Sequence, residues 1–275
     1  MTADMHVHTL ASDGMFSPEE VVSLAVDAGL SALAVTDHDT VFNTEKVNTL
    51  CEKVGINGIA GVEISAYVGD VKIHTLGYGF DLCSPCFAEF MNELYEGSLE
   101  RASDIITKLS SVGVNLTLDE AKAQRAYSSV PVHAMHIARA AVKKGYGSSP
   151  FEFYKNYMMC GRAAYSDACR PTPKRAAEVI NAAGGIAVMA HPGRIEMPKE
   201  QLRSLISELC SAGLGGIEAV YSTHTVSDTA YFKEIAGQFG LLITGGSDAH
   251  YCGGRKRIGS PVFSPSEELR QKLKI

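Results

Sequence analysis

The sequence predicts an α/β fold in which a mainly parallel sheet or barrel is covered by helices. Short apolar runs alternate with helical patterns along most of the 275 residues. These runs are continuously apolar, which is typical of strands buried on both faces. Histidine and carboxylate side chains follow several of the runs, at the strand ends where parallel barrels carry their active sites.

Four strands and two helices are expected before residue 80. Ser17 and Glu20 form a capping-box pattern with Pro18 between them, which begins a helix that stops near Gly29. The run 31–36 reads as a strand because it is apolar and ends directly at a polar group. The expected strands are 4–8, 31–36, 58–64 and 71–78, and the expected helices are 17–29 and one that ends near residue 54.

The same rhythm returns after residue 170, but residues 84–160 carry helical patterns with no convincing strand. We therefore expect a discontinuous barrel domain made of residues 1–83 and 161–275, with residues 84–160 as a helical insertion. The later strands are expected at 186–190, 216–221 and 240–244. The helical patterns cover 87–109, 118–125, 133–144, 151–158, 172–183 and 199–212, with one more helix before residue 240.

Composition limits the class of protein. The net charge of −6 leaves no excess of Lys and Arg for coating a nucleic acid non-specifically. No basic-then-apolar leader opens the chain, and no apolar run approaches the roughly 20 residues of a membrane span. We therefore expect a cytoplasmic protein without a membrane partner. Seven scattered cysteines, with Cys83 and Cys86 as the only close pair, are expected to be reduced thiols.

Metal-binding side chains gather at the predicted strand ends. His6 and His8 stand two apart in the first strand and so share one face, and Asp248 and His250 repeat that spacing. His6-x-His8 alone could equally belong to a half-exposed strand. The candidates outnumber the roughly four ligands of one zinc ion, so either some only support ligands or two or three ions share the site. Imidazole with carboxylate favours Mn, Fe or Zn, and clustered ions are typical of hydrolysis at phosphorus.

The ordered motifs point to a family. They are His6-x-His8, Asp13-Gly14, Thr36-Asp37-His38-Asp39, Glu63, His74, Ala190-His191-Pro192-Gly193 and Ser247-Asp248-Ala249-His250. Together they resemble the motifs of the PHP (polymerase and histidinol phosphatase) family over about residues 3–261. The resemblance implies a distorted (β/α)7 PHP barrel with a two- or three-metal site at the strand ends. The pattern is most similar to stand-alone bacterial PHP phosphoesterases that act on nucleotides or RNA ends, judged also by residues 136–140.

The resemblance also implies a role for each site residue. The implied metal ligands are His6, His8, Glu63 and Asp248 for one ion, Glu63 with His74 and His136 for a second, and Asp13, His38 and His250 for a third. The implied catalytic residues are His191 and His224 on the substrate side and Asp37, which would orient a ligand histidine or the strand-end loop. The candidate phosphate clamps are Arg101, Arg139, Arg162 and Arg194.

Several of these residues have a plainer interpretation. Asp13-Gly14 is also a turn signal, and His74 could be a hydrogen-bonded core histidine. His133 competes with His136 because it lies three positions earlier on a predicted helix, and we favour His136 as the ligand. Ala134-Met135 stands where relatives usually carry Arg-Pro, so a phosphate-binding arginine is missing there. The basic stretch 253–257 could bind phosphate or form an ordinary surface loop.

The predicted function is that of a metal-dependent phosphoesterase, in which a metal-bridging hydroxide attacks the phosphorus of a small nucleotide such as a nucleoside 3′,5′-bisphosphate. Within this class, the alternatives are a phosphodiesterase acting on cyclic sugar or nucleotide phosphates and a 5′-3′ exoribonuclease acting on RNA 5′ ends. A non-catalytic metal-binding PHP module is an alternative of another class. A metal-dependent amidohydrolase also begins with a His-x-His strand, but it relies on a lysine that no strand end provides here.

Overall fold

The computed structural model describes residues 1–251 and 256–275. Its seven strands pair with their neighbours in chain order. Backbone hydrogen bonds from Asp248 N to His6 O (2.7 Å) and from His8 N to Ala249 O (3.0 Å) nearly close the sheet into a barrel. The predicted α/β barrel class is confirmed. The strands are β1 (Ala3–Val7), β2 (Ala32–Val35), β3 (Asn57–Val68), β4 (Val71–Tyr78), β5 (Ile186–Met189), β6 (Leu214–Tyr221) and β7 (Leu242–Gly246).

One strand runs against the others. β4 is antiparallel to both β3 and β5, whereas the remaining paired neighbours are parallel. The cause is local: only Gly69 and Asp70 connect β3 to β4, and a connection this short can only join antiparallel strands. Gly69 supplies the positive φ (57°) that the turn needs. The register pairs Ser65 with His74, and His74 thereby reaches the strand ends beside β3.

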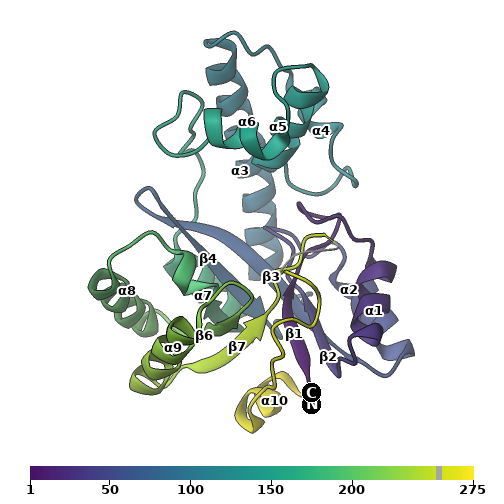
Figure 1. Cartoon of the computed structure of the whole chain (residues 1–275), viewed down its shortest axis with the longest axis vertical. Helices are drawn as coiled ribbons and strands as arrows, with labels where there is room; N and C mark the ends of the chain where they lie inside the picture. Colours follow the sequence, from purple (N-terminus) through teal and green to yellow (C-terminus); the bar gives the residue numbers. More distant parts are fainter. Residues whose placement is uncertain (252–255) are drawn as a thin grey trace.

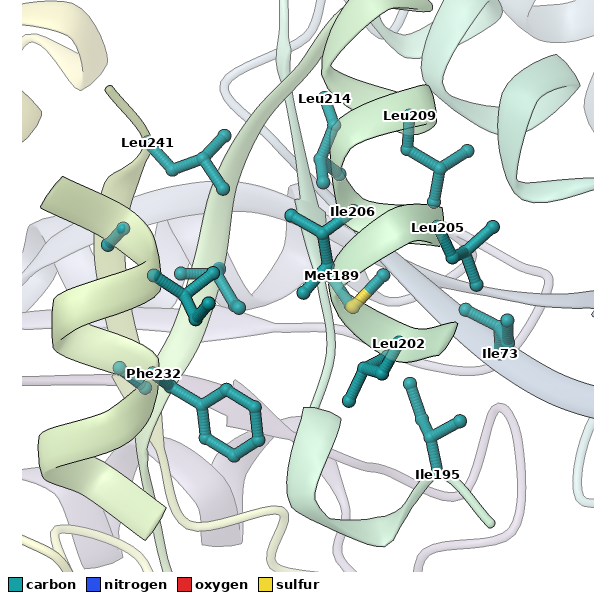
Figure 2. Close-up of a cluster of buried hydrophobic side chains, with 14 residues drawn as sticks. Ile73, Met189, Ile195, Leu202, Leu205, Ile206, Leu209, Leu214, Phe232 and Leu241 are labelled. Carbon is teal, nitrogen blue, oxygen red and sulfur yellow. The ribbon is translucent and has the colours of Figure 1, made fainter. Parts of the chain in front are cut away.

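Helices cover the outside of the barrel (Figure 1). Leu202, Ile206 and Leu209 of α8 recur at helical spacing and pack with Met189 of β5 and Phe232 of α9, as Figure 2 shows. Burying a side chain of this size contributes about 1.5–3 kcal/mol, so this stripe ties α8 to the sheet. The barrel helices are α1 (Pro18–Asp27), α2 (Thr44–Lys53), α7 (Pro173–Ala182), α8 (Lys199–Ser211), α9 (Val226–Phe239), α10 (Glu267–Leu273) and the 3₁₀ turn η1 (Pro192–Arg194).

The remaining helices form the helical insertion, which stands at one end of the molecule in Figure 1. Phe87 and Phe90, near the start of α3, pack in the barrel cluster around α7. Ile105 and Leu109, near its end, pack in a separate cluster with α5 and α6. The division at residues 84 and 160 stays a prediction, and α3 belongs to both packing units. The insertion helices are α3 (Pro85–Ser110), α4 (Leu118–Lys122), α5 (Ala134–Lys143) and α6 (Pro150–Tyr157).

Two further properties concern the described residues as a whole. None of the helices within them combines the length and the apolar character that crossing a membrane requires. Their six cysteines are all free of disulfides. Cys252 lies outside the described residues.

Candidate metal centre

Three overlapping groups of potential metal ligands lie at the end of the barrel where the parallel strands finish, with His74 added from the first half of the antiparallel β4. Within each group, one ligand atom from every residue lies within 4.8 Å of the others. His8, His38 and Glu63 each belong to two groups, so the groups share ligands. The three groups are His6, His8, Glu63 and Asp248; His38, Glu63 and His74; and His8, Asp13, His38 and His250.

The first group is buried and places several donor atoms around one point. The Nε2 atoms of His6 and His8 lie 3.1 Å apart, and each lies 3.1 Å from Oε2 of Glu63. Oδ1 of Asp248 lies 3.2 Å from Nε2 of His8. Imidazole nitrogens and carboxylate oxygens that converge in this way form a ligand set for Mn, Fe or Zn.

Unpaired buried atoms support the same interpretation. Buried polar atoms in proteins are nearly always hydrogen-bonded, because leaving them unpaired costs free energy. In the part of the chain that the structure describes, five such atoms of this site have no hydrogen-bond partner. They are His8 Nδ1, Asp13 Oδ1, His38 Nδ1, His74 Nε2 and His191 Nδ1. The residues present therefore fit a centre that binds divalent cations.

The charges of the groups are strongly coupled. Burial lowers the pKa of His8, but the carboxylates of Asp248 and Glu63 outweigh it and raise the pKa to about 10. Burial lowers the pKa of His74 to about 3. Burial would raise the pKa of Glu63, but the surrounding histidines, with His74 and His38 foremost, hold it well below its usual range. The Glu63 carboxylate stays ionised, and a divalent cation can replace the proton that His8 carries.

The second group contains His38 where the sequence predicted His136, and a further histidine lies beside it. We expected His136 beside Glu63 and His74, but the structure brings His191 there. Its Nε2 lies 2.9 Å from Oε1 of Glu63 and 3.2 Å from Nδ1 of His74. Nδ1 of His136 instead accepts a hydrogen bond from the backbone N–H of His133 (3.0 Å) at the start of α5. The His191 ring thus lies beside Glu63 and His74, where the sequence predicted His136.

The third group lies on the side of the centre that faces the helical insertion. Nε2 of His250 lies 3.2 Å from Oδ1 of Asp13, and Nε2 of His38 lies 4.0 Å from the same atom. His133 lies beyond them, with its ring centroid 6.2 Å from that of His38 and its Nε2 buried without a hydrogen-bond partner among the described residues. The sequence predicted His133 and His136 on one face of a helix, but α5 begins at Ala134 and His133 is its N-cap residue.

Comparison with known proteins identifies the family. The family model for the PHP domain matches residues 4–208, which is most of the chain. The chain belongs to the PHP family. It is 34% identical over 251 residues to a 5′-3′ exoribonuclease of Haemophilus influenzae (91% of this chain, 90% of the relative). It is 31% identical over 257 residues to a 3′,5′-nucleoside bisphosphate phosphatase of Chromobacterium violaceum (93% and 90%).

A solved structure supports the same assignment. A Bifidobacterium adolescentis protein assigned as a metal-dependent phosphoesterase superposes with a TM-score of 0.84 at 26% identity, covering 98% of this chain and 94% of its own. The predicted membership of the PHP family and the predicted class of enzyme, a hydrolase of phosphoester bonds, are confirmed.

In this PHP site, Asp37 holds the loop that carries Asp13. Its carboxylate accepts hydrogen bonds from the backbone and hydroxyl of Thr9 (2.7 and 2.5 Å) and from the Ser12 hydroxyl (2.6 Å). Gly14 completes the turn, because a Cβ there would lie 2.6 Å from the carbonyl of His8. The structure gives Asp37 the loop-orienting contacts that the sequence suggested.

His224 has a different place from the predicted one. Its Nε2 accepts a hydrogen bond from Gly193 N (3.1 Å), and its Nδ1 lies 3.1 Å from the carbonyl of Ala219. Both ring nitrogens are therefore used within the protein, and burial lowers the pKa of His224. The ring supports the turn after His191, and the predicted role in protonating a leaving group would require one of these two contacts to break.

The four candidate arginines separate in space. Nη1 of Arg194 lies 3.3 Å from Oδ2 of Asp248 and so reaches the metal centre. Arg139 donates to the carbonyl of Asp13 (3.3 Å) and steadies that loop. Arg101, in α3, donates to the carbonyl of Cys169 (3.4 Å), and Arg162, which follows α6, is exposed.

Two further side chains lie at the PHP site: the sequence singled out Lys256 only within the basic stretch 253–257, and it did not single out Glu218. Lys256 forms an ion pair with Oδ2 of Asp248, the oxygen that also accepts a hydrogen bond from the Tyr221 hydroxyl (2.6 Å). Lys256 belongs to the basic stretch 253–257, of which residues 253–255 lie outside the described residues. Glu218 contributes a buried carboxylate that contacts His6 and His191. No motif marks Glu218, because it lies within an apolar strand.

Proposed function

We propose that this PHP phosphoesterase hydrolyses a phosphate ester of a small nucleotide, such as a nucleoside 3′,5′-bisphosphate, and uses two or three divalent cations (Mn, Fe or Zn). The observation that carries the proposal is the position of Glu63 between ligand groups that share it. Its Oε2 faces His6 and His8, whereas its Oε1 faces His74 and His191. A carboxylate placed in this way can bridge two cations. We keep a cytoplasmic location as part of the proposal.

Different sets of side chains would bind the individual cations. His6, His8, Glu63 and Asp248 would hold one cation; Glu63, His74 and His191 a second; and Asp13, His38 and His250 a third. When bound, such cations neutralise phosphate oxygens and make hydroxide available near neutral pH.

Basic side chains at the edge of the centre fit a phosphate. Arg194 and Lys256 both approach the single oxygen Oδ2 of Asp248, so two positive charges face one carboxylate. The Arg194 side chain is 51% exposed and that of Lys256 is 25% exposed, so solvent and substrate can reach both. We propose that they bind the non-bridging oxygens of the substrate phosphate, for which a guanidinium fork is well suited.

A screen with Mn²⁺ tests the substrate class. It would cover mononucleotides, nucleoside 3′,5′-bisphosphates, cyclic phosphates and short 5′-phosphorylated RNA, with elemental analysis of the protein alongside. We expect inorganic phosphate from the bisphosphates and loss of activity with a chelator. Release of mononucleotides from RNA would favour an exoribonuclease, and ring opening of cyclic phosphates a diesterase. Inactivity with metal bound would favour the non-catalytic module, and hydrolysis of amides alone would favour an amidohydrolase.

A further inference from the structure

We propose that Glu218 is a positioning residue that orients two ligand histidines of the metal centre with one carboxylate. Glu218 lies in β6, and its side chain is completely buried inside the barrel (0% exposed). A buried carboxylate is tolerated only where other groups pair with it. Its two oxygens meet different partners, which come from β1 and from the end of β5. The inference rests on the proposed metal-dependent function.

The first contact selects a tautomer of His6. Oε1 of Glu218 lies 2.9 Å from Nδ1 of His6; because a carboxylate oxygen only accepts, Nδ1–H is the donor of this hydrogen bond. The Nε2 lone pair of His6 then points away from Glu218, toward Oε2 of Glu63 at 3.1 Å. A carboxylate behind a ligating histidine fixes the ring orientation and makes the ligand nitrogen more basic. Glu218 therefore prepares His6 to bind a cation through Nε2.

The second contact holds the backbone of His191. Oε2 of Glu218 accepts a hydrogen bond from the His191 N–H at 2.7 Å. His191 has φ 26° and ψ 59°, a conformation that residues other than glycine seldom adopt and that the surroundings must maintain. This conformation turns the ring back toward Glu63, with Nε2 at 2.9 Å from Oε1. Glu218 thus supports His191, which lies beside Glu63, as well as His6 of the first ligand group.

The neighbouring strand leaves little tolerance at His6. β7 lies between β6 and β1, and a Cβ at Gly246 would lie 2.4 Å from the Cβ of His6. The backbones of β7 and β1 therefore approach closely at this point, which fixes the position of the His6 Cβ atom. With Cβ fixed, the orientation of the His6 ring depends on the hydrogen-bond partner of Nδ1, which is Glu218.

The substitution Glu218→Gln tests these two contacts, because glutamine has the same size as glutamate but cannot accept both hydrogen bonds. Both partners of Glu218 are N–H donors, so both oxygens must accept. A glutamine offers one accepting oxygen, and its amide group would face either the His6 Nδ1–H or the His191 N–H, donor against donor. One of the two hydrogen bonds is lost in either orientation.

The test measures metal affinity in the whole protein. Mn²⁺ is titrated into metal-free wild type, E218Q and the control E208Q, whose glutamate is exposed on α8, by competition with a chelator. We expect E218Q to bind Mn²⁺ about 10- to 100-fold more weakly, the range typical of groups that support ligands, and E208Q to match wild type. Unchanged affinity in E218Q, or a lower melting temperature without a change in affinity, would overturn the proposal.

A second measurement keeps the inference testable if E218Q fails to fold. Nitrogen-15 NMR of the wild-type protein loaded with Zn²⁺ reports which nitrogen of His6 carries the proton. We expect a protonated Nδ1 and a metal-bound Nε2, and the opposite tautomer would overturn the role of Glu218. Failure of the wild-type protein to bind Mn²⁺ or Zn²⁺ would instead contradict the proposed function, so the two failures are distinguishable.

Discussion

Replacing Glu63 by glutamine tests the centre most directly. Oε1 lies 2.5 Å from Nδ1 of His74 and 2.9 Å from Nε2 of His191, and Oε2 lies 3.1 Å from Nε2 of both His6 and His8. A glutamine has one ligating oxygen, so its NH₂ group must face one of the two ligand groups. If it faces His74 and His191, that side retains two protein ligands, below the roughly three that catalytic sites use, whereas the other side would retain His6, His8 and Asp248.

The magnitude follows from this count. We expect Glu63→Gln to lose about one cation per chain and about 4 kcal/mol of transition-state stabilisation, the several kcal/mol that one cation supplies. This corresponds to a roughly 1000-fold lower kcat/KM. Phosphate release and elemental analysis of the same preparation measure both effects, with E208Q as the control. Full metal content with kcat/KM within about threefold of wild type would refute the bridging role of Glu63.

Three further predictions concern individual contacts. His191→Ala should lower metal content and reduce kcat/KM by about 100-fold or more, whereas His136→Ala should leave metal content unchanged, because only the former ring reaches Glu63; equal metal loss in both variants would contradict this assignment. Lys256→Met should raise KM by about 10- to 150-fold, since a charge-assisted contact to phosphate contributes about 1.5–3 kcal/mol, whereas the exposed Lys174→Met should not; an unchanged KM for Lys256→Met would place Lys256 outside the substrate site. Burial lowers the pKa of His8, but Asp248 and Glu63 raise it to about 10, so the metal-free ring is protonated at neutral pH. Mn²⁺ must displace that proton, and affinity should rise with pH; calorimetric binding enthalpies that do not depend on the buffer would contradict proton release.

Local patterns in the sequence were enough for much of this protein. Continuous apolar runs between helical patterns predicted the barrel, because strands buried on both faces leave that pattern. His6 and His8 could be placed together because residues two apart in a strand share a face. The order of the motifs indicated the PHP family, and with it a phosphoesterase.

Only the tertiary structure decided how distant residues meet. The two-residue turn between β3 and β4 reverses β4 and places His74 beside Glu63, although the later strands resume the parallel order. His191 and Glu63 are 128 positions apart, and Glu218 and His6 are 212 apart. Such contacts depend on how the strands are ordered and how the barrel closes, and no local periodicity records either. The sequence alone therefore determined the fold class and the chemistry of the candidate ligands, whereas the nearly closed barrel placed His191, and not His136, beside Glu63 and brought Glu218 behind His6.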